Sequence, residues 1–416
     1  MSWLFHRSMM HRAARFDIRR AVLLGAAIWC APSLGAQVYV QPLLSVRAQT
    51  SSNIDLATDP AQRQQTEGYL GDAATVIGIA TPRSDTTLRP RIQYQYFPEE
   101  TALNRLEAFL DFTTQYNSPR SNFAMFGRYD HRDEINAERP AAVYNDLAPT
   151  PTASPETGRV RVGTTRDDFV IMPTYSYQLT QRVGIGASAN LETLNYSSAD
   201  DTSHVDFNYY QGRGFVSWSP SPRTKLAFGG YASKYDAKHI DSQSTSYGTS
   251  VDYDIHWSEV FASHAAIVYQ RTDVDMTQPR IFQDRTNAWG ANVSSTYTAQ
   301  LSQIRFNLGR TINPSGGGGL YESDEARVQY QRDLSERWGV TTAARYLRSR
   351  ALSSDSNGND RNYVRANVYL TWNMTRFWFV EGGYDYSWQK YENDPNSAAD
   401  STFSVRFGYK GIPRQR

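Results

Sequence analysis

The sequence predicts an all-β fold, namely a transmembrane, antiparallel, up-and-down β-barrel of about 18 strands, with 16 as the alternative strand count. Three observations support this prediction. The chain begins with a leader typical of secretion, its composition combines low hydropathy with many aromatic residues, and its alternating runs are joined by connectors that alternate in length.

Residues 1–36 have the layout of a secretory signal peptide. Five arginines and a single acid precede a short apolar run at 21–31, and small residues at 33–36 offer a cleavage site before Gln37. The apolar run is shorter than the ~20 residues that a spanning helix needs, which argues against an N-terminal anchor. The sole cysteine, Cys30, lies in this leader, so the expected barrel domain, 37–416, has no thiol.

Composition limits the classes of function. The chain has 43 basic and 42 acidic residues, so no net field draws it to nucleic acid. Its mean hydropathy is −0.59, yet it contains 27 tyrosines and 9 tryptophans. A transmembrane barrel needs apolar residues only at alternate positions over a band ~25 Å tall, so this composition favours a barrel over the alternative, a soluble periplasmic β protein.

Alternation of apolar and polar residues is clearest from Asp360 to Tyr409 and recurs along the chain. Each run has one apolar and one polar face, because strand side chains have a period of two. We predict strands at 38–49, 69–80, 88–97, 105–116, 122–131, 168–179, 182–195, 205–219, 223–235, 246–258, 259–272, 284–299, 302–312, 322–333, 338–350, 361–373, 376–391 and 401–410.

The connectors between these runs alternate between short and long. The short ones include 180–181, 219–222, 258–259, 300–301, 334–337 and 374–375. The long ones include 51–67, 132–166, 197–204, 236–246, 273–283, 313–320, 353–360 and 392–400. Outer-membrane barrels have short periplasmic turns and long outer loops, so we expect an outer-membrane location with both ends of the mature chain in the periplasm. The longest connector, 132–166, is expected to lie outside the cell or to fold into the lumen.

A barrel in lipid must close, because an unpaired strand edge in hydrocarbon costs several kcal/mol. The run 401–410 should therefore pair with the first run, 38–49. Its aromatic residues resemble the C-terminal targeting strand of outer-membrane proteins, although six residues follow it here.

Two segments carry a resemblance to a group of poorly characterised outer-membrane β-barrels that occur with exopolysaccharide-export or exosortase (PEP-CTERM) loci. They are 42–47 with 52–56 (PLLSVR and SNIDL), and 328–332 with 334–338 (VQYQR and LSERW). The resemblance implies an envelope role linked to polysaccharide. The expected partners are outer-membrane lipid and lipopolysaccharide, the barrel-assembly machinery and, through the resemblance, polysaccharide; nucleic acid is not expected.

Strand phase predicts which charged residues line the lumen. The inward arginines are Arg47, Arg89, Arg91, Arg105, Arg128, Arg213, Arg305, Arg327, Arg345, Arg365 and Arg406. The inward acids are Glu107, Asp111, Asp130, Asp252, Asp254, Glu325, Glu381 and Asp385. They could select an anionic solute, or pair across strands and brace a wet lumen. Arg47, Arg89 and Arg91 are the least compensated group and the best candidate for a ligand-facing patch.

No catalytic residue, metal site or cofactor is expected. Asp252, Asp254 and His256 share one strand face and could bind a cation, but a polar ladder in the lumen explains them better. His264 is a conceivable base for an enzyme at the barrel rim, although no motif singles out a serine nucleophile. The glycines 316–319 indicate a flexible loop tip rather than a phosphate-binding loop, because no lysine or helix follows.

The resulting hypothesis is a porin-like outer-membrane barrel, in a Gram-negative envelope, that acts as a passive channel or conduit for exopolysaccharide or a related anionic solute. The alternative is a structural or adhesive barrel whose lumen is plugged and whose outer loops are functional.

Overall fold

The computed structural model describes residues 36–144, 163–197, 204–238, 242–276, 282–352, 360–411 and 414–415. Apart from Ala36, the expected leader lies outside this part of the chain. So do 145–162 of the longest connector and the middle of four shorter ones, at 198–203, 239–241, 277–281 and 353–359. No helix in the described ranges is both long and apolar enough to cross a membrane.

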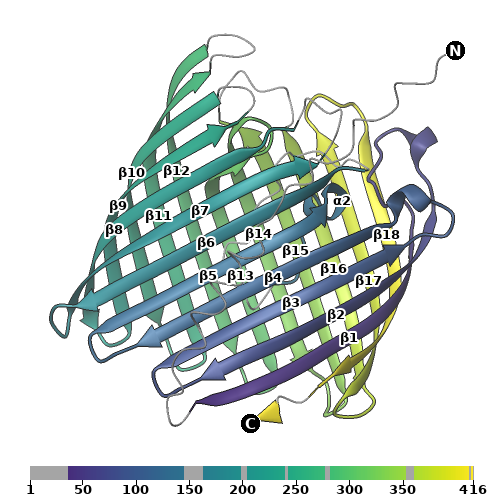
Figure 1. Cartoon of the computed structure of the whole chain (residues 1–416), viewed down its shortest axis with the longest axis horizontal. Helices are drawn as coiled ribbons and strands as arrows, with labels where there is room; N and C mark the ends of the chain where they lie inside the picture. Colours follow the sequence, from purple (N-terminus) through teal and green to yellow (C-terminus); the bar gives the residue numbers. More distant parts are fainter. Residues whose placement is uncertain are drawn as a thin grey trace, which may run out of the picture.

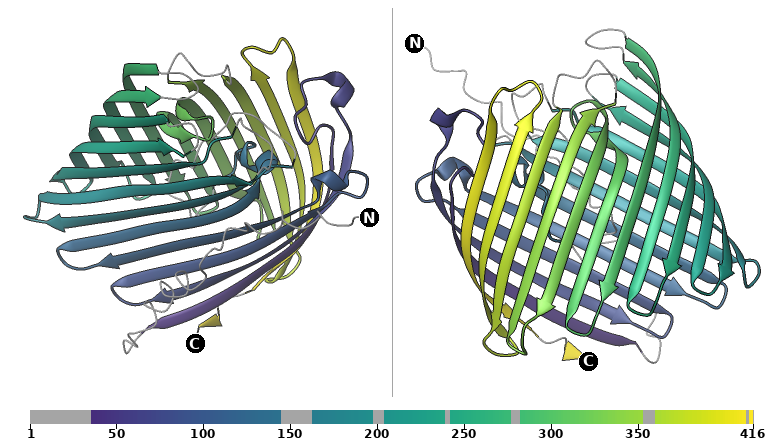
Figure 2. Two further views of the ribbon diagram at one scale, coloured as in Figure 1. Left: turned by 45° about the horizontal axis from the view of Figure 1, so that its top comes forward. Right: turned by 180° about the vertical axis from the view of Figure 1, so that it is seen from behind.

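Eighteen long strands form a closed antiparallel β-barrel (Figures 1 and 2). Their bounds are β1 (Gln37–Ser51), β2 (Thr66–Ala80), β3 (Ser84–Tyr96), β4 (Arg105–Asn117), β5 (Ser121–Asp133), β6 (Thr165–Gln178), β7 (Val183–Ser197), β8 (Phe207–Ser221), β9 (Thr224–Ala237), β10 (Ser242–His256), β11 (Phe261–Met276), β12 (Phe282–Thr298), β13 (Ser302–Ser315), β14 (Gly319–Asp333), β15 (Trp338–Ala351), β16 (Arg361–Asn373), β17 (Trp378–Tyr391) and β18 (Ser397–Lys410). The described parts of the connectors contain three short helices, η2 (Pro60–Gln62), η3 (Thr101–Leu103) and α2 (Glu134–Ala137).

Each strand pairs with its neighbours in the chain, and β18 pairs with β1 to close the barrel, as predicted. Closure runs from Leu43 opposite Lys410 to Ser51 opposite Thr402. The tail adds a two-residue strand that the alternation did not predict, β19 (Arg414–Gln415), which continues the pairing along β1. All eighteen predicted runs correspond to strands, but the bounds of the strands differ from the predicted ones by up to four residues in either direction.

Two of the predicted long connectors are wrong. The first, 236–246, is no longer than a short turn, because β9 ends at Ala237 and β10 begins at Ser242. The chain from Asn313 to Leu320 is not a long loop, because β13 and β14 pair up to Ser315 and Gly319 and leave only a three-glycine turn. Gly318 has a φ of +96°, a backbone conformation that glycine adopts without strain. The longest connector is also shorter than predicted, since β5 and β6 extend to Asp133 and Thr165.

The two faces of the wall differ as predicted. Large apolar side chains such as Val46, Ile92 and Phe403 are exposed on the outside, whereas polar side chains such as Glu107 and Asp130 are buried inside. A closed wall with this polarity is the architecture of outer-membrane barrels, because strand pairing around the ring satisfies backbone groups that would otherwise face lipid.

Tryptophans in the described part of the chain stand in the outward phase of their strands or in turns, and most lie near the short turns. There Trp338 stacks on Trp372 with ring centres 5.9 Å apart, and Trp378 stacks on Phe407 at 5.1 Å. Aromatic residues of this kind mark the border of the apolar band. We call this end of the barrel, at the lower edge of Figure 1, the turn end, and the opposite end the loop end.

Candidate functional site

The first third of the long connector, 134–144, lies inside the barrel at the loop end. Its helix α2 begins after Asp133, whose carboxylate caps the helix by accepting from the Ile135 amide at 2.9 Å. The Ile135 side chain is fully buried in a cluster with Ile54, Phe97 and Leu103. The β1–β2 and β3–β4 connectors therefore pack on α2 and fix the start of the segment.

A row of three arginines holds the rest of this segment against the wall. Arg327, Arg345 and Arg365 stand directly opposite one another on β14, β15 and β16. Like charges at facing positions repel each other, so the row needs a compensating partner. Two acids compensate part of this positive charge. Glu325 accepts from Arg345 at 2.8 Å, and Asp385 accepts from Arg365 at 3.1 Å.

Backbone carbonyls of segment 134–144 are the other partners of these three arginines. Arg365 donates to the carbonyl of Arg139 at 3.0 Å, and Arg345 donates to that of Ala141 at 3.3 Å. Arg327 donates from Nε to the carbonyl of Ala142 at 2.7 Å, and its Nη2 donates to the carbonyl of Val143. The arginine row thus binds four of the five backbone carbonyls of 139–143, so these contacts hold the segment through its main chain.

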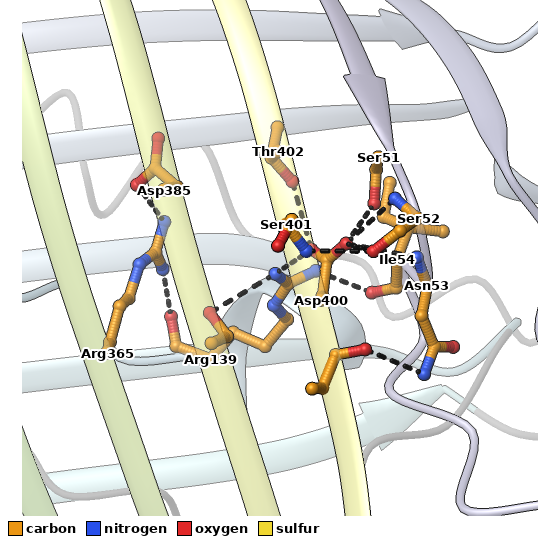
Figure 3. Close-up of polar contacts among 12 residues, drawn as sticks. Ser51, Ser52, Asn53, Ile54, Arg139, Arg365, Asp385, Asp400, Ser401 and Thr402 are labelled. Carbon is orange, nitrogen blue, oxygen red and sulfur yellow. Dashed lines mark hydrogen bonds and ion pairs between the residues drawn. The ribbon is translucent and has the colours of Figure 1, made fainter.

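Arg139 ties the segment to the closing strands of the barrel (Figure 3). Its guanidinium donates to Asp400 on β18 at 2.6 Å and to the carbonyl of Ile54 at 2.6 Å. The other oxygen of Asp400 accepts from the Ser51 hydroxyl at 2.7 Å and from the Ser52 amide at 3.0 Å. These charge-assisted bonds join β1, β18 and the segment in one buried network.

Tyr144 marks the end of the described segment. Its amide donates to Gln329 at 2.7 Å, and its ring lies 3.8 Å from the guanidinium carbon of Arg327. Arg305 lies over the same ring at 5.8 Å. Burial raises the pKa of the Tyr144 hydroxyl above its ordinary value, so it stays neutral in this basic surrounding.

The opposite wall also contacts the segment. Glu134, in α2, lies 2.7 Å from the ring nitrogen of His204, which precedes β8, and both side chains are almost fully buried. On the other side, Glu138 pairs with Arg361 of β16 at 3.3 Å, again with both side chains buried. The segment therefore spans the lumen from one wall to the other.

A cavity of about 180 Å³ lies beside this segment, against the closing strands. Six arginines and two acids line it: Arg47, Arg91, Arg105, Arg139, Arg365, Arg406, Asp72 and Asp385. Arg47 and Arg406 face each other across the β1–β18 pairing. Arg406 has Glu381 as a partner at 2.9 Å. Arg47 forms no ion pair within the described residues, and its Nε is buried without a hydrogen-bond partner.

The structure places each candidate charge on the inner face of the barrel, but most of them are paired. Besides the pairs described above, Arg91 binds Asp72 at 2.5 Å, Arg105 binds Asp133 at 3.2 Å, and Arg128 binds Asp168 at 2.5 Å. Arg213 binds Asp252, and Glu107 accepts from Asn136 at 2.8 Å. Arg89 stands opposite Asp111. The role of all these candidate charges as pore lining stays a prediction.

Within the group expected to be least compensated, Arg47 and Arg89 fit that description, because neither forms an ion pair within the described residues and the Nε of each is buried without a hydrogen-bond partner. The prediction was wrong for Arg91, because Asp72 lies on the adjacent strand β2, whose facing was ambiguous in the sequence. Arg89 stands opposite Asp111 across β3 and β4, but the two described side chains form no ion pair.

Sequence reasoning missed the residues that build the segment itself. Arg139, Glu134 and Glu138 lie in a stretch without periodicity, so no phase could assign their direction. Arg361 is the first residue of a predicted run, and Asp400 was predicted to lie in the connector 392–400, whereas β18 already begins at Ser397. Their only signal in the sequence is that charged residues cluster beside Pro140 within the longest connector.

The candidate cation site does not form. Asp252 pairs with Arg213, and Asp254 with His264 at 2.8 Å. Across the described ranges, no three His, Cys, Asp or Glu side chains gather as a metal site.

No known protein family and no curated protein matches the chain. Solved structures with a distant likeness include OccAB4 of Acinetobacter baumannii, with 10% identity over 91% of this chain and 100% of that chain and a TM-score of 0.43. The outer membrane protein opdK of Pseudomonas aeruginosa has 8% identity over 89% and 99%, with a TM-score of 0.43. OccK2 (OpdF) of P. aeruginosa, solved in complex with glucuronate, has 10% identity over 90% and 98%, with a TM-score of 0.44. The fold described above rests on the strand pairing of this chain alone.

Proposed function

We propose that this chain is an outer-membrane channel for small anions, in which segment 134–144 narrows the lumen and the basic cavity beside it selects the solute. The observation that carries the proposal is the cavity lining, in which arginines outnumber acids six to two. A lumen lined by cations lowers the barrier for anions and raises it for cations.

Arg47 is the residue on which selectivity would depend. It faces Arg406, a like charge that Glu381 already engages, and it has no ion pair of its own among the described residues. A guanidinium in this position binds a carboxylate or phosphate through charge-assisted hydrogen bonds. An entering anion would therefore supply the partner that the protein does not.

We favour small anions as the solute over the exopolysaccharide that the sequence resemblance implies. A polymer needs a wide, continuous path, whereas the segment is bonded to Arg361 on one wall and to His204 on the other. The remaining expectations belong to the same proposal: both ends of the mature chain in the periplasm, lipopolysaccharide around the barrel, and insertion by the barrel-assembly machinery.

Reversal potentials in planar bilayers under a KCl gradient test this proposal. We expect the natural chain to prefer chloride and Arg47→Ala to lower the chloride-to-potassium permeability ratio about threefold, as loss of ~0.7 kcal/mol of anion stabilisation would. Arg47→Lys should keep most of the preference because it keeps the charge. Arg348→Ala, on the outer face of β15, is the matched control. Equal ratios in all four proteins would rule Arg47 out as the selecting residue.

A structural barrel with a plugged lumen is the second candidate. Besides the bonded segment, a buried apolar cluster fills part of the loop end, where Leu194, Phe207 and Tyr235 of one wall meet Leu320 of β14. Absence of conductance steps from correctly folded protein in the same bilayers would favour this second candidate.

A further inference from the structure

The barrel wall is incomplete between β12 and β13 at the loop end. Pairing of these strands stops at Ala291 opposite Arg310. Beyond that point, 282–290 pair only with β11, and 311–315 pair only with β14. The strand register has no pair between these two described stretches, and no turn or loop hydrogen bond joins them there. A seam therefore separates them, with an unpaired strand edge on β12.

The seam exists because the tip of the β13–β14 hairpin turns into the mouth of the barrel (Figure 2). Ile312 is in phase with the outward residues Ile304 and Leu308 of the same strand. It nevertheless packs on the buried apolar cluster at the loop end of β7–β9. The Tyr235 hydroxyl of β9 donates to the carbonyl of Ser315 at 2.8 Å, and the Ser242 hydroxyl of β10 donates to that of Gly318 at 3.2 Å. The tip thus lies on the lumen side of the wall, and the described edge of β12 beyond Ala291 is left without a partner strand.

A cavity of about 270 Å³ lies between the turned-in tip and the inner face of β8–β12. Its lining mixes apolar side chains, including Val268 and Ile312, with uncharged polar ones, including Gln270 and Asn292. The charged residues in the lining have partners, because Arg213 binds Asp252, and Arg310 binds an acid on β14. Unlike the basic cavity beside Arg47, this one suits a molecule that carries no net charge.

Arg310 connects this cavity with the outer surface. It belongs to the cavity lining, and its guanidinium carbon also lies 4.6 Å from the ring centre of Trp289, an outward residue of β12 that is 52% exposed. Asp324 holds Arg310 in place at 2.6 Å. The cation–π contact spans the mouth of the seam, so this pair closes it from outside.

The seam lies where the apolar band ends. Val293 and Leu308, just toward the turn end, are exposed apolar residues, whereas Arg285, just toward the loop end, is an exposed cation. An unpaired strand edge is costly in hydrocarbon but tolerable beside polar headgroups and water. The opening is therefore at the level of the lipid headgroups.

We propose that this seam is a side opening of the barrel, through which a small amphipathic molecule without net charge passes between the outer lipid surface and the cavity behind β12. The Arg310–Trp289 contact acts as its latch. This route lies in the opposite half of the barrel from the anion path and does not depend on it.

Thiol labelling in phospholipid vesicles tests the proposal, with the full chain in a Cys30→Ser background. Ser250→Cys puts a thiol in the side cavity, and Ser45→Cys puts a matched thiol in the basic cavity. Each is treated with N-phenylmaleimide, which partitions into lipid, and with N-(2-hydroxyethyl)maleimide, which stays in water. Both reagents are uncharged, so the selectivity of the anion path does not affect the comparison.

We expect the ratio of the two labelling rates, lipid-soluble over water-soluble, to be about tenfold higher at position 250 than at position 45. Adding Arg310→Ala should raise the rate with N-phenylmaleimide about threefold at position 250 and leave position 45 unchanged. Arg348→Ala, an outer-face control away from the seam, should change neither. Equal ratios at the two positions would overturn the side opening, and no effect of Arg310→Ala would overturn the latch.

Discussion

Glycines opposite inward-facing aromatic residues recur in the wall. Tyr39 faces Gly78, Phe379 faces Gly408, and Tyr369 faces Gly383. At each of these glycines an added Cβ would meet the facing ring at 2.7 Å or less. Each aromatic ring therefore lies against the backbone of the neighbouring strand at the position of the glycine.

Substitution of one such glycine should destabilise the barrel. In Gly383→Val the ring of Tyr369 must move and lose its 2.7 Å hydrogen bond to Asp385, so we expect a loss of about 1–3 kcal/mol in the free energy of unfolding. Urea titration in detergent micelles measures it. Gly382→Val is the matched control, because Gly382 has open space around its Cβ position. Equal unfolding midpoints would show that the ring does not need this glycine.

The long connector gains its structure from the wall rather than from its own sequence. Segment 134–144 contains a single turn of helix, and the arginine row of β14–β16 bonds to its peptide carbonyls. Conversely, the segment's carbonyls stabilise three facing cations that would otherwise repel each other. Each element thus depends on the other.

Loss of one arginine from the row should loosen the segment. Arg327→Met keeps the apolar stem but removes the donors to Ala142 and Val143, so we expect amide hydrogen exchange across 139–144 to quicken about tenfold, which corresponds to ~1.4 kcal/mol. Mass spectrometry of peptic fragments measures this rate. Arg348→Met, on the outer face, should leave exchange in the segment unchanged. If exchange in Arg327→Met were also unchanged, the carbonyl contacts would not hold the segment.

The whole molecule presents its apolar face outward and its charges inward. Trp218, Trp257, Trp338, Trp372 and Trp378 gather toward the turn end, and all are exposed. Their positions agree with an aromatic girdle at a membrane border. The loop end has no comparable ring of tryptophans in its described part, and outward charges such as Arg285 and Arg350 stand there instead.

Tryptophan fluorescence should report this orientation. In vesicles of lipid brominated close to the headgroup, we expect most of the emission to be quenched relative to unbrominated lipid, because the girdle lies at that depth. Lipid brominated near the end of the acyl chain should quench less. Emission that is insensitive to both lipids would contradict an outward apolar face.

Much of the fold could be predicted from the sequence, because strand periodicity and connector length are local properties. Alternation assigned the inner face to residues as far apart as Arg47 and Arg406, and the requirement for closure paired the strands that carry them. Pairing partners were harder to predict. Asp72 lies in a run of ambiguous phase, so its bond to Arg91 was missed.

The sequence by itself determined a closed barrel of alternating strands, since a period of two and the exclusion of free edges from lipid leave little choice. Only the tertiary structure decided how the lumen is filled. The position of segment 134–144 and the inward turn of the β13–β14 tip depend on contacts such as Arg139 with Asp400 and Tyr235 with Ser315, which join residues far apart in the chain. No local pattern encodes those contacts, because the partners meet only after the wall has closed.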